Sequence, residues 1–302
     1  GVSLYQSARL FEGNRITLGF DWQHIYGNAW YISKATGEEI ATTNKQSGKS
    51  HRNEVAGYVD FRQDIINWLT VDAGLRVDHH SVTGTELIPQ GGIVVRPMQT
   101  GELKAMVSKG FRNPSMKDLY LYPPSNEDLK PERIMNYELS WRHRISAFNY
   151  GVNIFYLKGD NMIQTVNKKN VNTGEIENCG GELEAAYRIN THCSLNTNHS
   201  FLHMKNKIIG APEYKGFIGA NCNYGKWNAI VGLQYLAGLY TEVGKNETKE
   251  NVCLLNATVG YALNRYIRFW IRGENLLAQN YEINKGYPMP RATFMGGINL
   301  KF

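Results

Sequence analysis

Long hydrophobic runs are missing from this sequence, and no stretch approaches the about 18 consecutive apolar residues that a membrane-spanning helix needs. Proline is scarce, with 9 in 302 residues, and no block of like charge stands out although the formal net charge is +6. A nucleic-acid-binding protein needs a clustered basic face. The composition therefore argues against helical membrane spans and against a nucleic-acid partner.

Other familiar signals are also missing. The opening residues, GVSLYQ, lack the basic start and the apolar stretch of a signal peptide, so we expect a processed chain or a piece of a longer one. Four cysteines, Cys179, Cys193, Cys222 and Cys253, have no CxxC or paired spacing. We therefore expect neither a zinc site nor a disulfide framework.

The eight histidines show no metal-ligand or catalytic-triad spacing. We therefore expect no enzyme, no metal site and no cofactor. Copper capture by the adjacent pair His79 and His80 is an alternative, but a solvated pair at a strand end is favoured.

Alternation of apolar and polar side chains is the main positive signal. From Ala292 to Phe302 every second residue can meet hydrocarbon, and the other parity carries Thr293, Asn299 and Lys301. A period of two predicts a strand with one apolar face. The same reading along the chain predicts about fifteen strands and no helix of more than two turns. Soluble β-sandwiches also contain such strands.

Two features favour a transmembrane barrel over a soluble sandwich. Aromatic residues make up 12% of the chain, including 18 tyrosines, which suits aromatic girdles at two membrane interfaces. When the connections between predicted strands are counted back from Phe302, longer loops alternate with turns of a few residues. A transmembrane barrel shows this alternation, because its short turns lie on the periplasmic side and its longer loops on the outer side. The mean hydropathy of −0.41 is compatible with a transmembrane barrel, because only alternate residues of each strand face lipid. We expect the cysteines to be small lipid-facing hydrophobes.

Three ordered motifs carry a resemblance. They read KGFRNPSMKDLY at residues 109–120, NEDLKPE at 126–132 followed by Tyr137 and Glu138, and GENLL at 273–277 followed by GYPMPR at 286–291. This arrangement resembles the barrel of TonB-dependent outer-membrane receptors. That family usually has Pro-Gly-Arg where this chain has Met289, Pro290 and Arg291.

The resemblance implies an all-β, antiparallel transmembrane barrel in the bacterial outer membrane. Such receptors have about 22 strands around a plug that precedes the barrel. We therefore expect residues 1–302 to be the C-terminal portion of a single barrel domain, without the plug and about seven upstream strands. Expected partners are outer-membrane lipids, the chain's own upstream plug and strands, the TonB complex and a surface lipoprotein.

The resemblance further implies active uptake of a large, scarce nutrient. We prefer cobalamin or another corrinoid, because residues 163–165, 170–174 and 274–281 are similar to that branch, and place a ferric siderophore or haem next. Alternatives are a passive porin or fatty-acid channel of about fourteen strands and, least favoured, an outer-membrane enzyme such as a lipase or protease.

Candidate site residues fall into two groups. Aromatic side chains in the longer loops could stack on a macrocycle; they are Trp30, Tyr31, Tyr120, Tyr122, Tyr281 and Tyr287. Charged side chains on the water-facing parity are expected to face the lumen and the plug; they are Asp60, Arg76, Asp78, Glu138, Arg142, Glu182, Glu184, Arg268, Arg272 and Glu274.

Overall fold

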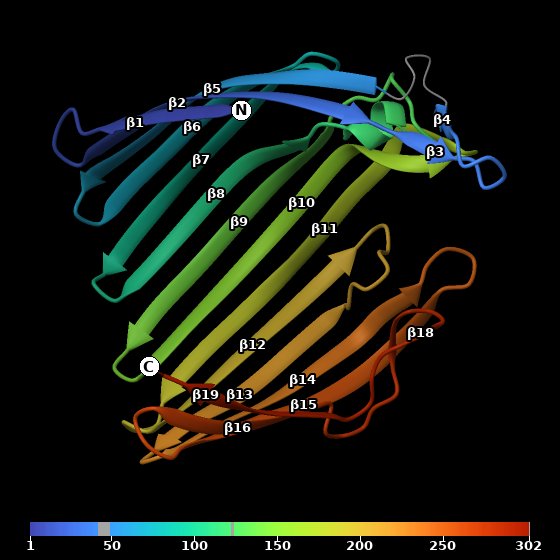
Figure 1. Ribbon diagram of the computed structural model, residues 1–302. Helices are drawn as coiled ribbons and strands as arrows, with labels where there is room; N and C mark the ends of the chain where they lie inside the picture. The colour runs from blue at the N-terminus through green and yellow to red at the C-terminus, as the bar shows by residue number, and fades with distance from the viewer. Residues whose placement is uncertain (42–48, 122–123, 302) are drawn as a thin grey trace. The chain divides into compact units, whose positions relative to one another are not determined.

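The computed structural model describes residues 1–41, 49–121 and 124–301 (Figure 1). Within these residues the chain is almost entirely β-strand, and the only helical element is a single π-turn, η1 (Lys117–Leu121). No described helix is long and apolar enough to cross a membrane.

Fifteen strands form one sheet in which neighbours in sequence are neighbours in space. The prediction of about fifteen strands is confirmed, as is the all-β class. The strands are, in order, β1 (Val2–Ala8), β2 (Asn14–Asn28), β5 (Lys49–Ile66), β6 (Leu69–His80), β7 (Gly84–Met98), β8 (Gly101–Arg112), β9 (Glu132–Ile145), β10 (Phe148–Val166), β11 (Lys169–Arg188), β12 (Cys193–Met204), β13 (Tyr214–Tyr224), β14 (Trp227–Glu242), β15 (Thr248–Ala262), β16 (Ile267–Glu274) and β19 (Thr293–Leu300).

Two small hairpins lie outside this sheet. The first pairs β3 (Trp30–Ile32) with β4 (Glu39–Ala41), and the second pairs β17 (Glu282–Asn284) with β18 (Tyr287–Pro288). The first lies in the long connection between β2 and β5, and the second in the long connection between β16 and β19.

The chain divides into two compact units, which are described separately. Unit 1 comprises Gly1–Pro97, Lys104–Leu139 and Tyr156–Glu177. Unit 2 comprises Met98–Leu103, Ser140–Phe155 and Asn178–Phe302, described to residue 301.

Strand pairing in unit 1 sorts side chains onto two faces. Val59 of β5 lies opposite Leu75 of β6, whereas the adjacent Asp60 lies opposite Gly74 on the other face. Val59 and Leu75 are 38% and 43% exposed. Large exposed apolar side chains along one face are typical of a sheet that meets lipid.

Unit 2 shows the same separation. Ile218 of β13 lies opposite Leu233 of β14, which in turn lies opposite Leu255 of β15. Ile218 is 56% exposed. In each unit we call this side the apolar face and the opposite side the polar face.

Aromatic side chains gather near the short turns of unit 2. The indole nitrogen of Trp141 donates to the hydroxyl of Tyr150 at 3.2 Å, and the rings of Trp227 and Tyr261 have centroids 4.7 Å apart. The amphipathic rings suit a membrane interface, because one end is apolar and the other can hydrogen-bond.

One expected loop is instead a long hairpin. The polar side chains from Asp160 to Gly174 predict a loop, but β10 continues to Val166 and β11 begins at Lys169. The turn residues Asn167 and Lys168 both have positive φ, 49° and 62°. Two such residues form the tight turn whose twist matches the flanking strands, so pairing continues to the tip.

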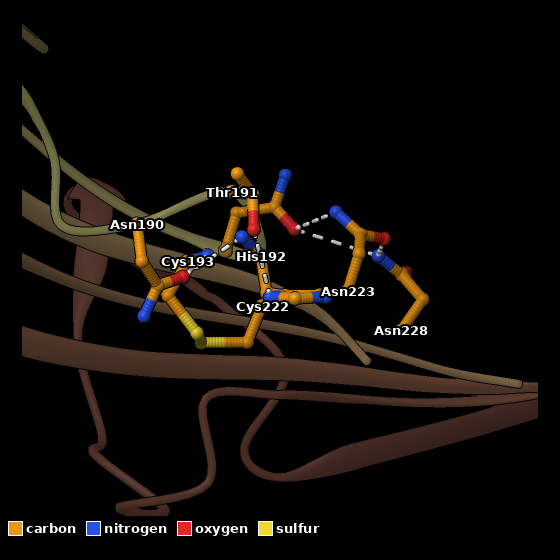
Figure 2. The surroundings of a disulfide bond; sticks show 8 residues. Asn190, Thr191, His192, Cys193, Cys222, Asn223 and Asn228 are labelled. Carbon is orange, nitrogen blue, oxygen red and sulfur yellow. Dashed lines mark hydrogen bonds between the residues drawn. A yellow bond between two sulfur atoms is a disulfide. The ribbon is translucent and has the colours of Figure 1, made fainter. Parts of the chain in front are cut away.

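The expectation for the cysteines is partly wrong. Cys193 of β12 and Cys222 of β13 form a disulfide, with their Cα atoms 4.3 Å apart (Figure 2). Cys179 and Cys253 are free. Spacing along the chain could not reveal the pair, because strand register brings together two residues that are 29 positions apart.

Candidate functional site

The loop between β8 and β9 in unit 1, residues 113–131, begins with a capped turn. The side-chain hydroxyl of Ser115 accepts the backbone N–H of Asp118 at 3.2 Å, and an Asp118 carboxylate oxygen accepts the backbone N–H of Ser115 at 2.9 Å. This reciprocal pair is a capping box, which satisfies free backbone donors at the start of a helical turn. It fixes the start of η1.

Apolar side chains bury the middle of this loop. Met116, Leu119 and Leu129 are 8%, 1% and 3% exposed. A Cβ atom added to Gly27 of β2 would lie 3.4 Å from both Met116 and Leu121. The loop is therefore packed against the outer end of β2.

Charged side chains hold both ends of the loop. Arg112, the last residue of β8, pairs with Glu132, the first residue of β9, and Arg52 of β5 donates to the Pro114 carbonyl at 2.6 Å. Glu132 lies outside the apolar band of β9, whose exposed apolar side chains run from Tyr137 to Ile145.

The pKa of Glu132 lies below its ordinary value of 4.5. Burial raises this pKa, but hydrogen bonds from Arg112 and from the backbone N–H of Ile163 lower it by more. The ionised carboxylate is therefore the form that holds the loop.

The outer half of the β10–β11 hairpin supports the same loop. Asn126 donates to the Asn170 carbonyl at 2.7 Å, and Asn172 exchanges hydrogen bonds with the backbone of Lys130 at 2.7 and 2.9 Å. The NEDLKPE motif thus contributes Asn126, the buried Leu129 and the ion-paired Glu132. Its residues build the loop scaffold.

Tyr120 lies on η1 and is half-buried. Burial, with a smaller contribution from Glu127, raises the pKa of its hydroxyl, so this group is a neutral hydrogen-bonding partner. Tyr122, the other candidate in this loop, lies outside the described residues.

The β3–β4 hairpin carries the candidates Trp30 and Tyr31. They are 42% and 45% exposed, and the neighbouring Ile32 and Ile40 are 66% and 51% exposed. Tyr31 lies opposite Ile40 across the hairpin. Sequence reasoning missed the two isoleucines, although apolar residues within a polar segment were a usable signal.

The loop between β16 and β19 in unit 2, residues 275–292, is organised by Asn275. Its side-chain amide donates to the carbonyls of Gln279 and Pro290 at 2.9 and 3.2 Å, and its oxygen accepts the N–H of Gln279 at 3.0 Å. The φ of Asn275 is +47°, a conformation that asparagine tolerates better than most residues. Sequence reasoning missed this role.

The two candidate tyrosines of this loop have different environments. Tyr281 packs against a buried cluster formed by Leu236, Leu239 and Val252, and burial raises the pKa of its hydroxyl. Tyr287, on β18 of the same loop, is 70% exposed. Tyr281 therefore anchors the loop, and Tyr287 is available to a ligand.

The charged candidates in unit 1 lie on the polar face. Arg76 of β6 pairs with Asp78 of the same strand at 2.9 Å and with Asp21 of β2, two strands away, at 2.5 Å. Asp60 accepts a hydrogen bond from Gln90 at 2.7 Å, and Glu138 accepts one from Asn136.

The polar face also has a hollow in unit 1, with a volume of about 380 Å³. Its lining includes Arg15, Asp60, Arg62, Asp72 and Lys104. Both signs of charge meet there, as expected for a hydrated inner wall.

The charged candidates in unit 2 are more exposed and more loosely paired. Arg142 lies 3.5 Å from Glu184, and Arg272 lies 3.8 Å from Glu274. Glu182 accepts a 3.5 Å hydrogen bond from Asn153, and Arg268 is exposed on β16.

His79 and His80 do not form a joint site. The Nδ1 atom of His79 lies 2.9 Å from the Thr85 hydroxyl, whereas the buried His80 accepts the backbone N–H groups of Val82 and Thr83. His80 thus stabilises the turn after β6. Across the described ranges, no group of three or more His, Cys, Asp or Glu residues could hold a metal ion.

Residues 3–276 match the sequence model of a protein family that is described as "TonB dependent receptor-like, beta-barrel". The chain belongs to this family. Barrels of the TonB-dependent receptor family lie in the bacterial outer membrane, so the chain is an outer-membrane β-barrel protein, with its short turns on the periplasmic side. The family comprises receptors, in agreement with the expectation that the chain is not an enzyme.

Individual relatives extend this result. The chain is 24% identical to the vitamin B12 transporter BtuB of Vibrio cholerae over 96% of its length, and 21% identical to that of Photobacterium profundum over 93%. It covers 48% and 49% of those proteins, about half of their length.

A solved structure supports the fold. The ferric enterobactin receptor of Pseudomonas aeruginosa, as the R480A mutant in complex with enterobactin, matches with a TM-score of 0.83 and 14% identity. The match covers 99% of this chain and 54% of that one.

Proposed function

We propose that the protein carries out TonB-dependent active uptake of a large, scarce nutrient, with cobalamin or a related corrinoid as the preferred cargo. Similarity to vitamin B12 transporters over 96% of the chain is the observation that carries this preference. Family membership over residues 3–276 supports the broader class of receptor.

The described residues have features that suit this task. Trp30, Tyr31 and Tyr287 present exposed aromatic rings on outer loops, and such rings can stack on the planar face of a macrocycle. The scaffolds of loops 113–131 and 275–292 hold their own backbones in place, which reduces the entropic cost of ordering a loop around its cargo.

We further propose that residues 1–302 form one portion of a single barrel domain whose polar face surrounds a plug. The ion pairs of Arg76 and the looser charges of Arg142 and Arg268 would hydrate that inner wall and meet polar groups of the plug. A TonB complex would supply the energy for release, and a surface lipoprotein is a further candidate partner.

The test is binding and uptake of radiolabelled cyanocobalamin by the full-length receptor. Cells that lack their own corrinoid receptor should gain saturable, TonB-dependent uptake, and an unrelated barrel expressed equally should give none. Binding no better than that of the unrelated barrel would exclude cobalamin and move the proposal to ferric siderophores or haem.

A passive channel predicts a different result. Uptake that persists without TonB, together with open-channel conductance of the purified full-length receptor in planar bilayers, would favour the porin alternative.

A further inference from the structure

The disulfide between Cys193 and Cys222 lies at the short-turn end of unit 2 (Figure 2). Cys193 opens β12 directly after the turn in which the Asn190 side chain accepts the backbone N–H groups of His192 and Cys193, at 2.8 and 2.9 Å. Short turns of an outer-membrane barrel lie on the periplasmic side. The bond is therefore at the periplasmic end of its two strands.

Strand pairing makes this position suitable for a disulfide. Cys193 lies directly opposite Cys222, and the backbone N–H of Asn223 donates to the His192 carbonyl at 2.8 Å. That hydrogen bond flanks the cysteines, so they form a non-hydrogen-bonded pair, the kind in which facing side chains are closest. The bond therefore joins two residues that face each other in the native register of β12 and β13.

The side-chain pattern of β12 specifies that register poorly. Residues 196–200 read NTNHS, five consecutive polar residues. Thr197 and His199 lie on the apolar face, opposite Ile218 and Gly216. Leu195 and Phe201 are the large apolar residues on that face, so the apolar face is interrupted in the middle of the strand and favours one register less than a continuous apolar face does.

The next strand pair provides a contrast. Ala229, Val231, Leu233 and Tyr235 of β14 give an unbroken apolar face. A one-residue shift there would turn polar side chains such as Asn228 toward lipid, which hydrophobicity alone opposes.

A two-residue shift of β12 would keep every side chain on its own face, so the face pattern would not oppose it. Cys193 would then lie opposite Ala220 or Tyr224. A shift of two residues displaces one cysteine by about 7 Å along the strand, so that the Cα atoms of Cys193 and Cys222 would lie about 8 Å apart. That separation exceeds the about 7 Å that a disulfide can span.

We propose that Cys193 and Cys222 are an oxidative modification site whose disulfide fixes the register of β12 on β13 while the barrel assembles. The proposal goes beyond cargo uptake and does not depend on which cargo is carried. It rests on the outer-membrane location of the chain and on the register of these two strands.

The chemistry is thiol–disulfide exchange in the periplasm, an oxidising compartment. One cysteine thiolate attacks the disulfide of a periplasmic thiol oxidant and forms a mixed disulfide; the second thiolate then attacks the Cys sulfur of that bond and releases the oxidant as a dithiol. Two S–H bonds are lost and one S–S bond forms. The two electrons and two protons leave on the reduced oxidant.

Peptide mapping of the full-length receptor tests whether the bond forms. Cells are alkylated without reduction, and the protein is then denatured and digested with trypsin. Cys193 and Cys222 fall in separate tryptic peptides, residues 189–205 and 216–226. We expect these peptides to be linked, and the peptides with Cys179 and Cys253 to be alkylated. Alkylated, unlinked Cys193 and Cys222 would overturn the proposal.

A set of variants tests the role in assembly. The variant C193A/C222A removes the bond but keeps small apolar side chains, and C179A/C253A is its matched control. Leu195 and Ala220 form the next facing pair on the same side. The variant L195C/A220C in the C193A/C222A background therefore places the disulfide at this neighbouring pair, in the same strand register.

The readout is the heat-modifiable, folded fraction of receptor in the outer membrane. We expect C193A/C222A to lower this fraction several-fold, C179A/C253A to leave it unchanged, and oxidised L195C/A220C to restore it. Any other combination overturns the register role, while cobalamin uptake by the receptor that does fold reports separately on the proposed function.

Discussion

Loops 113–131 and 275–292 both lie at the outer ends of their strands, but different forces hold their described residues. The first is fixed by a capping box, by the ion pair between Arg112 and Glu132 that joins its two ends, and by the buried Leu119. The second is fixed by the amide of Asn275, by the packing of Tyr281 on an aliphatic cluster, and by contacts of Glu282 and Lys285 with the carboxylates of Glu250 and Glu242. Protonation of Glu132 would release both ends of the first loop, whereas the amide of Asn275 does not titrate.

The substitution Leu119→Ala should have the largest effect on this comparison. Leu119 is 1% exposed, and truncating a buried leucine costs about 2 to 5 kcal/mol. Loop 113–131 should open while loop 275–292 is unaffected. Hydrogen exchange of peptides from both loops in the full-length receptor would measure this, with the exposed Lys117→Ala as control. Equal exchange in L119A and K117A would contradict the prediction.

The corresponding change in the second loop is Asn275→Ala. It removes three hydrogen bonds at a site of positive φ, with an expected cost of about 1 to 3 kcal/mol. Exchange should rise in residues 275–292 and stay unchanged in 113–131. Asn284→Ala, on the exposed part of β17, is the matched control. The role assigned to Asn275 is wrong if the two variants behave alike.

Low pH should destabilise loop 113–131 more than loop 275–292. The pKa of Glu132 is lowered in the folded protein, so its contribution to stability is present above pH 4.5 and is lost as pH falls through the lowered value. Hydroxyl-radical labelling of the buried Met116 should therefore rise below pH 4.5, and labelling of Tyr281 should rise less.

The variant Glu132→Gln provides the control for this titration. It should show raised Met116 labelling at neutral pH and a weaker response to acid. An E132Q receptor that responds to acid as the wild type does would assign the pH dependence to another group.

The smallest effect on stability is expected for Tyr287→Ala. Tyr287 is exposed, so stability should change by less than about 0.5 kcal/mol. If Tyr287 stacks on the cargo, cobalamin binding should weaken about 3- to 10-fold. Tyr266→Ala, an exposed tyrosine beside a short turn of the same unit, should bind as the wild type does. Equal affinities for both variants would remove Tyr287 from the binding surface.

Much of the sheet could be predicted from the sequence. Side-chain alternation predicts strands at Glu132–Ile145 and Cys193–Met204, and β9 and β12 have these bounds, because a period of two is a local property that turn residues interrupt. The hairpin at Asn167 was missed, because polar side chains continue through it and suggested a loop.

The candidate sites were less predictable. The motifs at residues 109–120 and 126–132 suggested a receptor loop, but not that Leu119, Leu129 and Glu132 form its scaffold. Tyr281 and Tyr287 are only six positions apart, yet one is packed and the other exposed. Nothing in the adjacent sequence distinguishes them, because burial depends on whether a distant cluster lies beneath each ring.

The sequence by itself determined the approximate number of strands, the two faces of most of them and the family. These follow from side-chain alternation and from short motifs, both of which are local. Only the tertiary structure decided which loop residues are buried anchors and which cysteines are bonded. Those outcomes depend on register, which sets distances between residues far apart in the chain and is weakly specified where the middle of a strand, as in β12, is polar on both faces.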